Sequence, residues 1–455
     1  MYTTVRGIPG DAGDSDDPGR SGGSAGAGVS AGAAVSRAPT RTRRVPRLVV
    51  TLGLVSCFTD LSSEMVVAVL PVYLTLVLGL TPLQYGVIDG LYQGVTAAVR
   101  ILGGLVADLT HRPKIVAALG YSLSCVCKLF FLPAHSFAAI TTLVAVDRSG
   151  KGLRTAPRDA MIAAAADPAA LGYSFGVHRA MDTAGALGGP LLAFGVLALL
   201  VNGYHLLFVL SFSLAAVGVA VLVLFVPGRP RPQTHAADQA AGAIEPAGPT
   251  RIGRTLREFV ALTRDGGYRR LLGVGGLLSL TTINDGFIYL TLKDRAGLAA
   301  TWFPLLYVGT AAVYLVLAIP LGRLADRTGR VRVFLGGHGL AAIGYLGLLV
   351  LPSGPGLIAA VLALIGGYYA ATDGVLPALT APMVSKGVRS TGIAGVQTMM
   401  AIGGMLSAAV FGGLWAGFGQ RTAVGCFLAG LTLAIGASLL LLRGPRPASA
   451  AVATG

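Results

Sequence analysis

The stretch GRLADRTGRVR (residues 322–332) repeats the pattern of an earlier stretch, GLVADLTHRPK (residues 104–114). In each, a glycine precedes an aspartate by four positions, and these glycines, Gly104 and Gly322, are 218 residues apart. A second set of matches, at an offset of 219 residues, relates Gly176, Val177, Met181 and Gly185 to Gly395, Val396, Met400 and Gly404. Two independent matches at nearly one offset predict that the chain consists of two duplicated halves.

The composition around these repeats is that of an integral membrane protein. Of the 455 residues, 54% are hydrophobic and only 12% are charged, against about 25% charged residues in an average soluble domain. A soluble protein of this size has no way to bury so much apolar surface. The formal charge of +15 therefore indicates basic cytoplasmic loops rather than nucleic-acid binding.

Apolar runs of about 20 residues, the length that spans a bilayer, predict an all-α membrane protein with about twelve transmembrane helices. They lie at roughly 48–74, 84–107, 114–132, 137–157, 174–199, 206–226, 270–291, 303–322, 332–351, 356–378, 393–417 and 423–442. Together with the duplication they predict two pseudo-symmetric six-helix bundles, 46–226 and 270–443. We expect a disordered cytoplasmic tail at 1–45, a cytoplasmic linker with an amphipathic helix at 227–269, and a second tail at 444–455.

The basic residues predict the orientation in the membrane. They are concentrated before the first run, between runs 2 and 3, in the linker, between runs 8 and 9, and after the last run, whereas the opposite face has only Lys293, Arg295 and Arg421. The positive-inside rule then puts both termini in the cytoplasm. The abundance of Arg, Ala and Gly is typical of a GC-rich bacterial genome, so we expect a bacterial plasma membrane.

The two stretches quoted first resemble the loop signature of the major facilitator superfamily, Gly-x-x-x-Asp-Arg-x-Gly-Arg. Residues 322–332 match it fully, while residues 104–114 depart from it, with Leu109 in place of a base and His111 in place of glycine. The resemblance implies the twelve-helix major facilitator fold, with the substrate site between the halves. It also implies a loop latch that holds the halves in one state, formed by Gly104, Asp108, Arg112, Gly322, Asp326, Arg327 and Arg330.

A glycine pattern in the fifth run, Gly176, Gly185, Gly189 and Pro190, resembles the antiporter motif of the proton-driven drug and metabolite exporters of that superfamily. Small residues let two helices approach closely, and such a seam seals one face against proton leak. Ala193 and Phe194 replace the usual closing glycine pair. A glycine-rich membrane helix without this function is the alternative.

The fourth run, VDRSGKGLRTAPRD (146–159), resembles the membrane-embedded arginine motif of the superfamily at Arg148, which implies proton coupling. Lys151 and Arg154 depart from that motif by adding charge. At 100° per residue, Arg148, Lys151, Arg154 and Arg158 fall on one helix face. This basic stripe favours an anionic substrate, which therefore remains an alternative.

A charge inside the bilayer costs at least ~2.5–3.5 kcal/mol on insertion scales, so it needs a partner or a watery cavity. In and near the runs of the first half we count seven bases, at 100, 128, 148, 151, 154, 158 and 179, against six acids, at 60, 64, 89, 147, 159 and 182. This near balance predicts a paired network rather than a bare anion trap.

Asp60 and Glu64 lie four residues apart and share one helix face. We hypothesise that they form a protonatable pair with Arg148 as neighbour and Asp182 as a further member, because two close carboxylates favour binding one proton between them. Structural ion pairs are the alternative. His178 and Asp182 could join them around a divalent cation, but a hydrogen-bonded histidine is the simpler interpretation, and we predict no metal site.

Aromatic and polar residues of the runs predict a substrate cavity for an amphipathic organic molecule. The candidates are Tyr92, Gln93, Lys151, Arg154, Asp285, Tyr289, Asp373 and Gln397, with Tyr73, Tyr307 and Tyr314 as further aromatic positions.

The sequence therefore predicts a secondary active transporter, a proton-coupled exporter of a small organic compound working by alternating access. A uniporter or symporter for an anionic metabolite, a divalent-cation exporter and a non-transporting membrane sensor remain alternatives. No phosphate-binding loop or hydrolase motif is present, so we expect no enzyme activity and no cofactor. The expected partners are the substrate, protons and the lipid bilayer, with no nucleic acid, and we expect a monomer.

Overall fold

The computed structural model describes residues 45–110, 112–166, 171–200, 202–227, 261–373, 375–384 and 389–443. Every regular element in this part of the chain is helical. The predicted tails at 1–45 and 444–455 and nearly all of the predicted linker lie outside the described residues.

The first half contains the helices that the first six apolar runs predict, each within a few residues except for the end of the fourth. They are α1 (Arg47–Val67), α2 (Leu70–Val72), the π-helical turn η1 (Tyr73–Val77), α3 (Pro82–Thr110), α4 (Pro113–Phe130), α5 (Phe137–Ala165), α6 (Leu171–Leu199) and α7 (Tyr204–Phe225). The fourth run was predicted to end near residue 157, but α5 continues to Ala165 because Pro157 does not break it.

The second half has the same order of long helices. Its elements are α9 (Gly266–Leu280), α10 (Asp285–Ala296), the 3-10 turn η3 (Ala300–Trp302), α11 (Phe303–Thr328), α12 (Arg330–Val350), α13 (Pro355–Thr372), α14 (Val375–Thr380), the 3-10 turn η4 (Ala381–Met383), α15 (Arg389–Phe418) and α16 (Gln420–Arg443). The predicted all-α membrane class is confirmed.

Ten helical segments in the described residues are long and apolar enough to cross a membrane. The 29-residue helices α3 and α5 are equally long but are not among the ten. Helix α5 alone carries six charged residues, from Asp147 to Asp159. In α5, this charge rather than shortness separates the helix from the ten.

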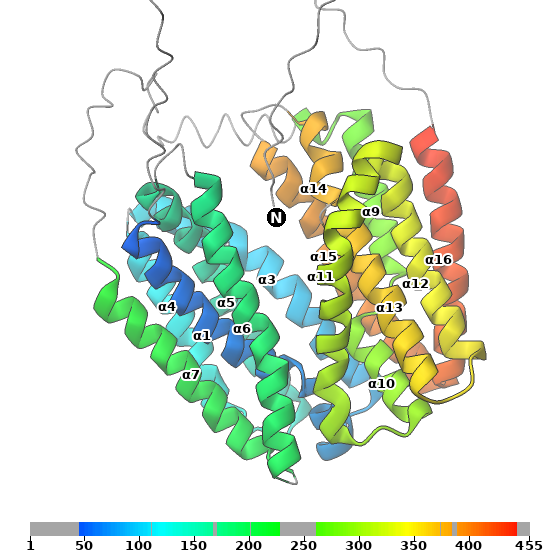
Figure 1. The fold of residues 1–455 in the computed structure, drawn as a ribbon, viewed down its shortest axis with the longest axis horizontal. Helices are drawn as coiled ribbons and strands as arrows, with labels where there is room; N and C mark the ends of the chain where they lie inside the picture. Colours follow the sequence, from blue (N-terminus) through cyan, green and yellow to red (C-terminus); the bar gives the residue numbers. More distant parts are fainter. Residues whose placement is uncertain are drawn as a thin grey trace, which may run out of the picture.

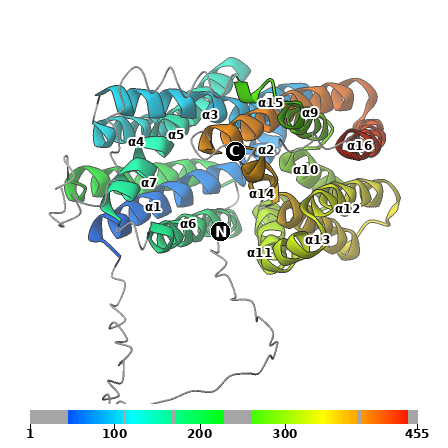
Figure 2. The ribbon, with the colours of Figure 1, turned by 90° about the horizontal axis from the view of Figure 1, so that it is seen from above.

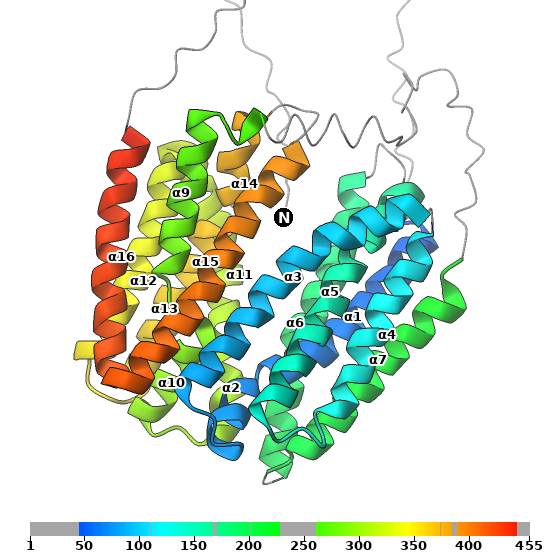
Figure 3. The ribbon, with the colours of Figure 1, turned by 180° about the vertical axis from the view of Figure 1, so that it is seen from behind.

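The helices form two groups, α1 to α7 and α9 to α16, side by side (Figures 1 and 2). The start of α3 crosses the end of α15, and the two helices diverge toward the end of the molecule where α9 begins and α16 ends (Figure 3). Glycines make this crossing close, because a side chain at Gly86 or Gly90 would collide with the backbone of Ala408 or Met405. The groups also meet where Phe194 of α6 contacts Trp302, with ring centroids 5.3 Å apart.

The first apolar run of each half is interrupted in the structure, and the sequence did not predict either break. The first run breaks between Val67 of α1 and Leu70 of α2. The seventh breaks at 281–284, between α9 and α10. Inside a membrane such breaks are tolerated only where the freed backbone groups line a cavity or are buried in protein.

The glycine pattern of α6 packs this helix against α1. A side chain at Gly185 would collide with the backbone of Cys57, and one at Gly189 would collide with the backbone of Met65. Gly176, at the other end of the pattern, has open space where a side chain would be. The predicted seam is therefore a contact within the first half, made by only part of the pattern.

A buried ionic triad joins α4 and α5. The Lys128 ammonium lies 3.3 Å from an Asp147 carboxylate oxygen, and the other oxygen of Asp147 accepts hydrogen bonds from the Arg148 guanidinium. The Arg148 guanidinium also stacks 3.9 Å from the centre of the Tyr92 ring. All three charged side chains are less than a tenth exposed, so removing the single acid would leave two buried cations together.

We predict that Gly185→Ala lowers the thermal unfolding temperature of the purified protein relative to Gly176→Ala. Each substitution raises helix propensity by up to ~1 kcal/mol, but only at Gly185 does the added methyl force α1 and α6 apart, at about 1–3 kcal/mol. The measurement is tryptophan-monitored melting in detergent. Equal melting temperatures for the two variants would contradict the assigned seam.

We predict that Asp147→Asn destabilises the protein by about 3–5 kcal/mol, because breaking a buried ion pair leaves uncompensated charge. The matched control is Asp294→Asn, which removes an acid that is 48% exposed and paired with Lys293 at 3.4 Å, and it should change stability by less than about 1 kcal/mol. Denaturant or thermal unfolding of both variants tests this; a wild-type-like Asp147→Asn would contradict it.

Candidate functional site

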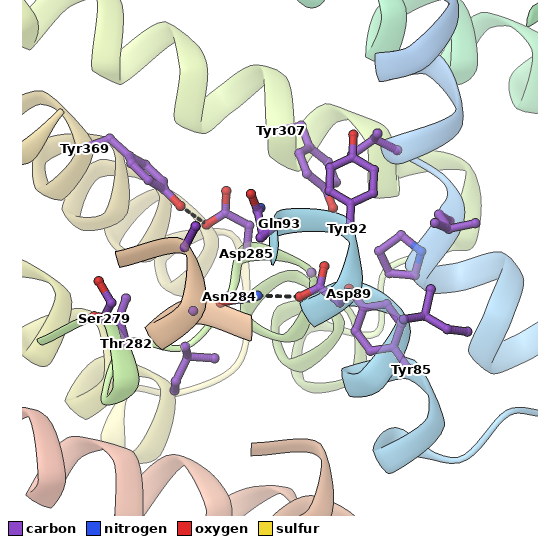
Figure 4. A pocket seen from close by; sticks show the side chains of 18 of the residues that line it. Tyr85, Asp89, Tyr92, Gln93, Ser279, Thr282, Asn284, Asp285, Tyr307 and Tyr369 are labelled. Carbon is purple, nitrogen blue, oxygen red and sulfur yellow. Dashed lines mark hydrogen bonds between the residues drawn. The ribbon is translucent and has the colours of Figure 1, made fainter. Parts of the chain in front are cut away.

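A cavity of about 510 Å³ lies between the two groups of helices, beside both helix breaks. Helix α3 contributes Tyr85, Asp89, Tyr92 and Gln93, and the α9–α10 segment contributes Ser279, Thr282, Asn284 and Asp285 (Figure 4). Tyr307 of α11 and Tyr369 of α13 also line this cavity (Figure 4). Both halves therefore supply polar side chains to one cavity.

Hydrogen bonds fix the acidic side chains of this cavity. The Asn284 amide, at the N-cap of α10, donates to the Asp89 carboxylate at 2.6 Å and so links the two halves. The Tyr369 hydroxyl donates to the Asp285 carboxylate at 2.7 Å. Asp285 begins α10, where the positive end of the helix dipole stabilises a carboxylate.

A second cavity, of about 240 Å³, adjoins the first. The two cavities share Glu64, Asp285, Tyr307 and Tyr369. Pro190, from the glycine pattern of α6, also lines the second cavity. The α1–α6 seam therefore ends beside the same pair of adjoining cavities.

Acids outnumber bases in the lining of these two cavities. The lining includes Glu64, Asp89, Asp285 and Asp373 but, of the bases, only Lys151. Lys151 pairs with Glu64 at 3.5 Å. Asp89, Asp285 and Asp373 form no ion pair with any described residue.

The basic stripe of α5 is paired with acids along its length. Besides the Arg148–Asp147 and Lys151–Glu64 pairs, Arg154 lies 3.4 Å from Asp60 of α1. Arg158 lies 2.9 Å from Asp159 and 3.7 Å from Asp182. Lys128 also pairs with Asp147, and Arg179 pairs with Asp182 at 3.6 Å. Of the seven bases counted in the first half, Arg100 alone lacks an ion pair to a described residue. Of the six acids, Asp89 alone lacks one.

Asp60 and Glu64 have different neighbours although they share one face of α1. Glu64 pairs with Lys151 at the cavity, whereas Asp60 pairs with Arg154 and lies close to the Asp182 carboxyl of α6. Arg148, the expected neighbour of Asp60 and Glu64, pairs with Asp147.

His178 lies in a hydrogen-bonded position, with its Nε2 3.0 Å from the Ser56 hydroxyl. The described residues contain no group of three or more His, Cys, Asp or Glu side chains arranged to hold a metal ion.

Most predicted cavity residues line the two cavities, and two do not. Tyr92, Gln93, Lys151, Asp285, Tyr289 and Asp373 are lining residues. Arg154 instead pairs with Asp60 and stacks 4.4 Å from the Tyr121 ring centre, and Gln397 is exposed and lines neither cavity. Tyr73 packs in the core against Tyr204.

The sequence did not single out Tyr85, Asn284 or Tyr369 as cavity residues, and it counted Asp89 only among the embedded charges. The signal that could have found Asn284 is the short polar sequence TTIND at 281–285, in the middle of an apolar run. It marks the α9–α10 break, and broken helices in corresponding halves indicate a transporter binding site.

The predicted latch residues lie apart from the cavity, at the α3–α4 and α11–α12 turns. Asp326 and Arg330 form an exposed local pair at 3.2 Å. Gly329, which the loop signature requires as glycine, has a φ of 106°, a conformation that other residues rarely adopt. Gly322 has open space around it rather than a close helix contact. The side chain of Asp108 lies outside the described residues.

Comparison of the sequence with known families gives matches across the chain. The family described as Major Facilitator Superfamily matches residues 52–313 and 277–454. An uncharacterized MFS-type transporter of Methanocaldococcus jannaschii is 28% identical over 407 residues, covering 88% of this chain and 95% of that protein. An uncharacterized protein of Mycobacterium tuberculosis is 27% identical over 393 residues, covering 84% and 86%.

The fold is similar to those of solved transporters. The nucleoside transporter NupG superposes with a TM-score of 0.67 at 13% identity, over 88% of this chain and all of that one. A POT family transporter in complex with 5-aminolevulinic acid gives 0.69 at 15%, over 87% and 96%. A bacterial homologue of the human lysosomal transporter Spinster, inward-facing and occupied, gives 0.67 at 14%, over 87% and 96%. By sequence across nearly its whole helical part, this chain belongs to the major facilitator superfamily.

Proposed function

We propose that this protein is a proton-coupled exporter of a small organic compound. Membership of a transporter family supports a function in membrane transport. The cavity of about 510 Å³ between the halves is of the size that holds a small organic molecule. Solved relatives of the fold carry nucleosides or bind 5-aminolevulinic acid. The observation that carries proton coupling is the adjacent carboxyl pair, Asp60 and Asp182.

The carboxyl pair is suited to hold one exchangeable proton. Two neighbouring carboxylates repel each other when both are ionised, and one proton between them removes that repulsion. Arg154 and Arg158 lie beside the pair, at 3.4 Å from Asp60 and 3.7 Å from Asp182. Their positive charge lets the pair release the proton again, so the site can load and unload as access alternates.

The proton site is connected to the substrate cavity through α1. Asp60 and Glu64 lie one turn apart on this helix, and Glu64 lines both cavities. Protonation of the pair weakens the Asp60–Arg154 ion pair between α1 and α5. Because α1 ends at the cavity wall, this change in charge alters the packing of a helix that the substrate also contacts.

The charge distribution supports an orientation in the membrane. The helices diverge on the side where α9 begins and α16 ends (Figure 1), which the basic residues assign to the cytoplasm. We infer that this is the inward-facing state of a plasma-membrane protein. The seam between α1 and α6, which resembles the antiporter motif, favours export over import.

The alternative substrates of the sequence analysis lose their support. An anionic metabolite was favoured by the basic stripe of α5, but all four of its bases are paired with acids. A divalent cation was favoured by His178 and Asp182, but His178 is hydrogen-bonded to Ser56.

We predict that Asp60→Asn or Asp182→Asn reduces proton-driven accumulation of a transported compound at least tenfold while leaving substrate counterflow intact. Counterflow exchanges one substrate for another and moves no net proton, so it checks that the variant is folded and binds. The compound is identified first by ligand-dependent thermal stabilisation. Proteoliposomes with an imposed pH gradient give the measurement, with Asp294→Asn as control. Wild-type coupling in both variants would rule out this proton site.

We predict that inverted membrane vesicles, energised with protons inside, accumulate the same compound, whereas right-side-out vesicles expel it. The physical reason is that export coupled to proton entry moves substrate and protons in opposite directions. Accumulation in energised right-side-out vesicles would contradict export, and the absence of gradient-dependent flux across a broad compound panel would favour the membrane-sensor alternative.

A further inference from the structure

The geometry points to an organic cation as the substrate: an amine or quaternary ammonium compound whose positive charge binds at Asp285 and whose apolar body lies against the tyrosine wall. This inference rests on the proposed transport function and specifies the chemistry that the cavity selects. Three independent features of the described residues carry it.

The first feature is the excess of acid in the cavities. Asp89, Asp285 and Asp373 line them without a basic partner among the described residues, and the single lining base, Lys151, is already 3.5 Å from Glu64. In the rest of the first half nearly every embedded charge is paired. Charge left unpaired inside a membrane protein is costly and by default marks a functional site. A bound cation would supply the missing partner, whereas a bound anion would add to the repulsion.

The second feature is the direction of the broken helices. Helices α1 and α9 both end at the main cavity, where Val67 and Ser279 are lining residues. The C-terminal end of a helix carries a partial negative charge, and this charge favours a cation. Neither helix has a basic residue in its last turn to neutralise it. In transporters built from broken helices, such C-terminal ends coordinate small coupling cations.

The third feature is the aromatic wall. Tyr85, Tyr307, Tyr368 and Tyr369 line the main cavity, and the faces of such rings attract cations. The chain uses this attraction itself, since the Arg148 guanidinium lies 3.9 Å from the centre of the Tyr92 ring. Tyrosines also give the apolar contact that a bare metal ion cannot use, and the described residues hold no metal-type cluster.

Asp285 is the carboxylate best placed to hold the charge. It borders both cavities, is the first residue of α10, and is oriented by the Tyr369 hydroxyl at 2.7 Å (Figure 4). Asp89 of α3, in the other half, is 2.6 Å from the amide of the neighbouring Asn284. A cation between them would contact acids from both halves, so its binding would bridge the two groups of helices.

The test compares two probes of the same shape and opposite charge, tetraphenylphosphonium and tetraphenylborate, binding to the purified full-length protein in detergent. Equilibrium dialysis measures the affinities, and empty micelles give the background. We expect the phosphonium to bind at least tenfold more tightly than the borate, and benzyltrimethylammonium, a smaller cation with one aromatic ring, to compete with it.

The matched variants are Asp285→Asn and Asp294→Asn, two neutralised acids of the same helix α10, one in the cavity and one exposed. Asp285→Asn should weaken phosphonium binding at least tenfold and leave borate binding unchanged or stronger, and Asp285→Glu should recover part of the affinity. Asp294→Asn should bind as wild type. If Asp285→Asn does not fold, Asp373→Asn takes its place, and the preference of the wild type for the cation remains decisive.

Equal binding of the two probes, preference for the borate, no binding of either cation, or unchanged phosphonium affinity in a folded Asp285→Asn variant would each overturn the inference. These results are separate from the proposed function, because binding in detergent requires no gradient. Proton-driven efflux of a neutral or anionic compound would support the proposed exporter function and contradict the organic-cation substrate. Cation binding without gradient-driven flux would support the organic-cation site and contradict the proposed exporter function.

Discussion

An ionised side chain inside a bilayer needs a partner of opposite charge, and this requirement organises the first half of the molecule. The bases of α5 face acids from α1 and α6 as well as from α5 itself, so that one helix face is held by ion pairs such as Arg154–Asp60 at 3.4 Å and Arg158–Asp182 at 3.7 Å. Close glycine contacts between α6 and α1 bring these acids within reach. The charge network and the helix packing of this half therefore depend on each other.

The second half follows a different principle. Its acids at the cavity have no basic partner among the described residues, and the Tyr369 hydroxyl donates to Asp285 at 2.7 Å. The interrupted helices place polar backbone at the same depth. Most embedded charges of the first half are thus paired with one another, whereas Asp285 and Asp373 of the second half line the cavities without a basic partner among the described residues.

Much of the architecture was predictable because hydrophobic length is a strong local signal. The predicted runs coincide with observed helices, although α5 and α11 continue to Ala165 and Thr328, past the predicted ends at 157 and 322, and the first and seventh runs are interrupted. The breaks at 281–284 and after Val67 were missed because residues on both sides are apolar, and only a short polar stretch marks the first of them. The pairing of Asp60 with Asp182 was not accessible from spacing, since the two residues lie on different helices and spacing reports only neighbours within one helix.

The sequence by itself determined that this is a duplicated, all-helical membrane protein, that it resembles the major facilitator superfamily, and that its charges are concentrated in the first half. These properties depend on local composition and on repeats, which need no knowledge of helix packing. Only the tertiary structure decided which acid neutralises which base, and that Asp89, Asp285 and Asp373 have no basic partner among the described residues. The physical reason is that charge balance inside a membrane is set by distances of a few ångströms between different helices, and those distances exist only once the helices have packed.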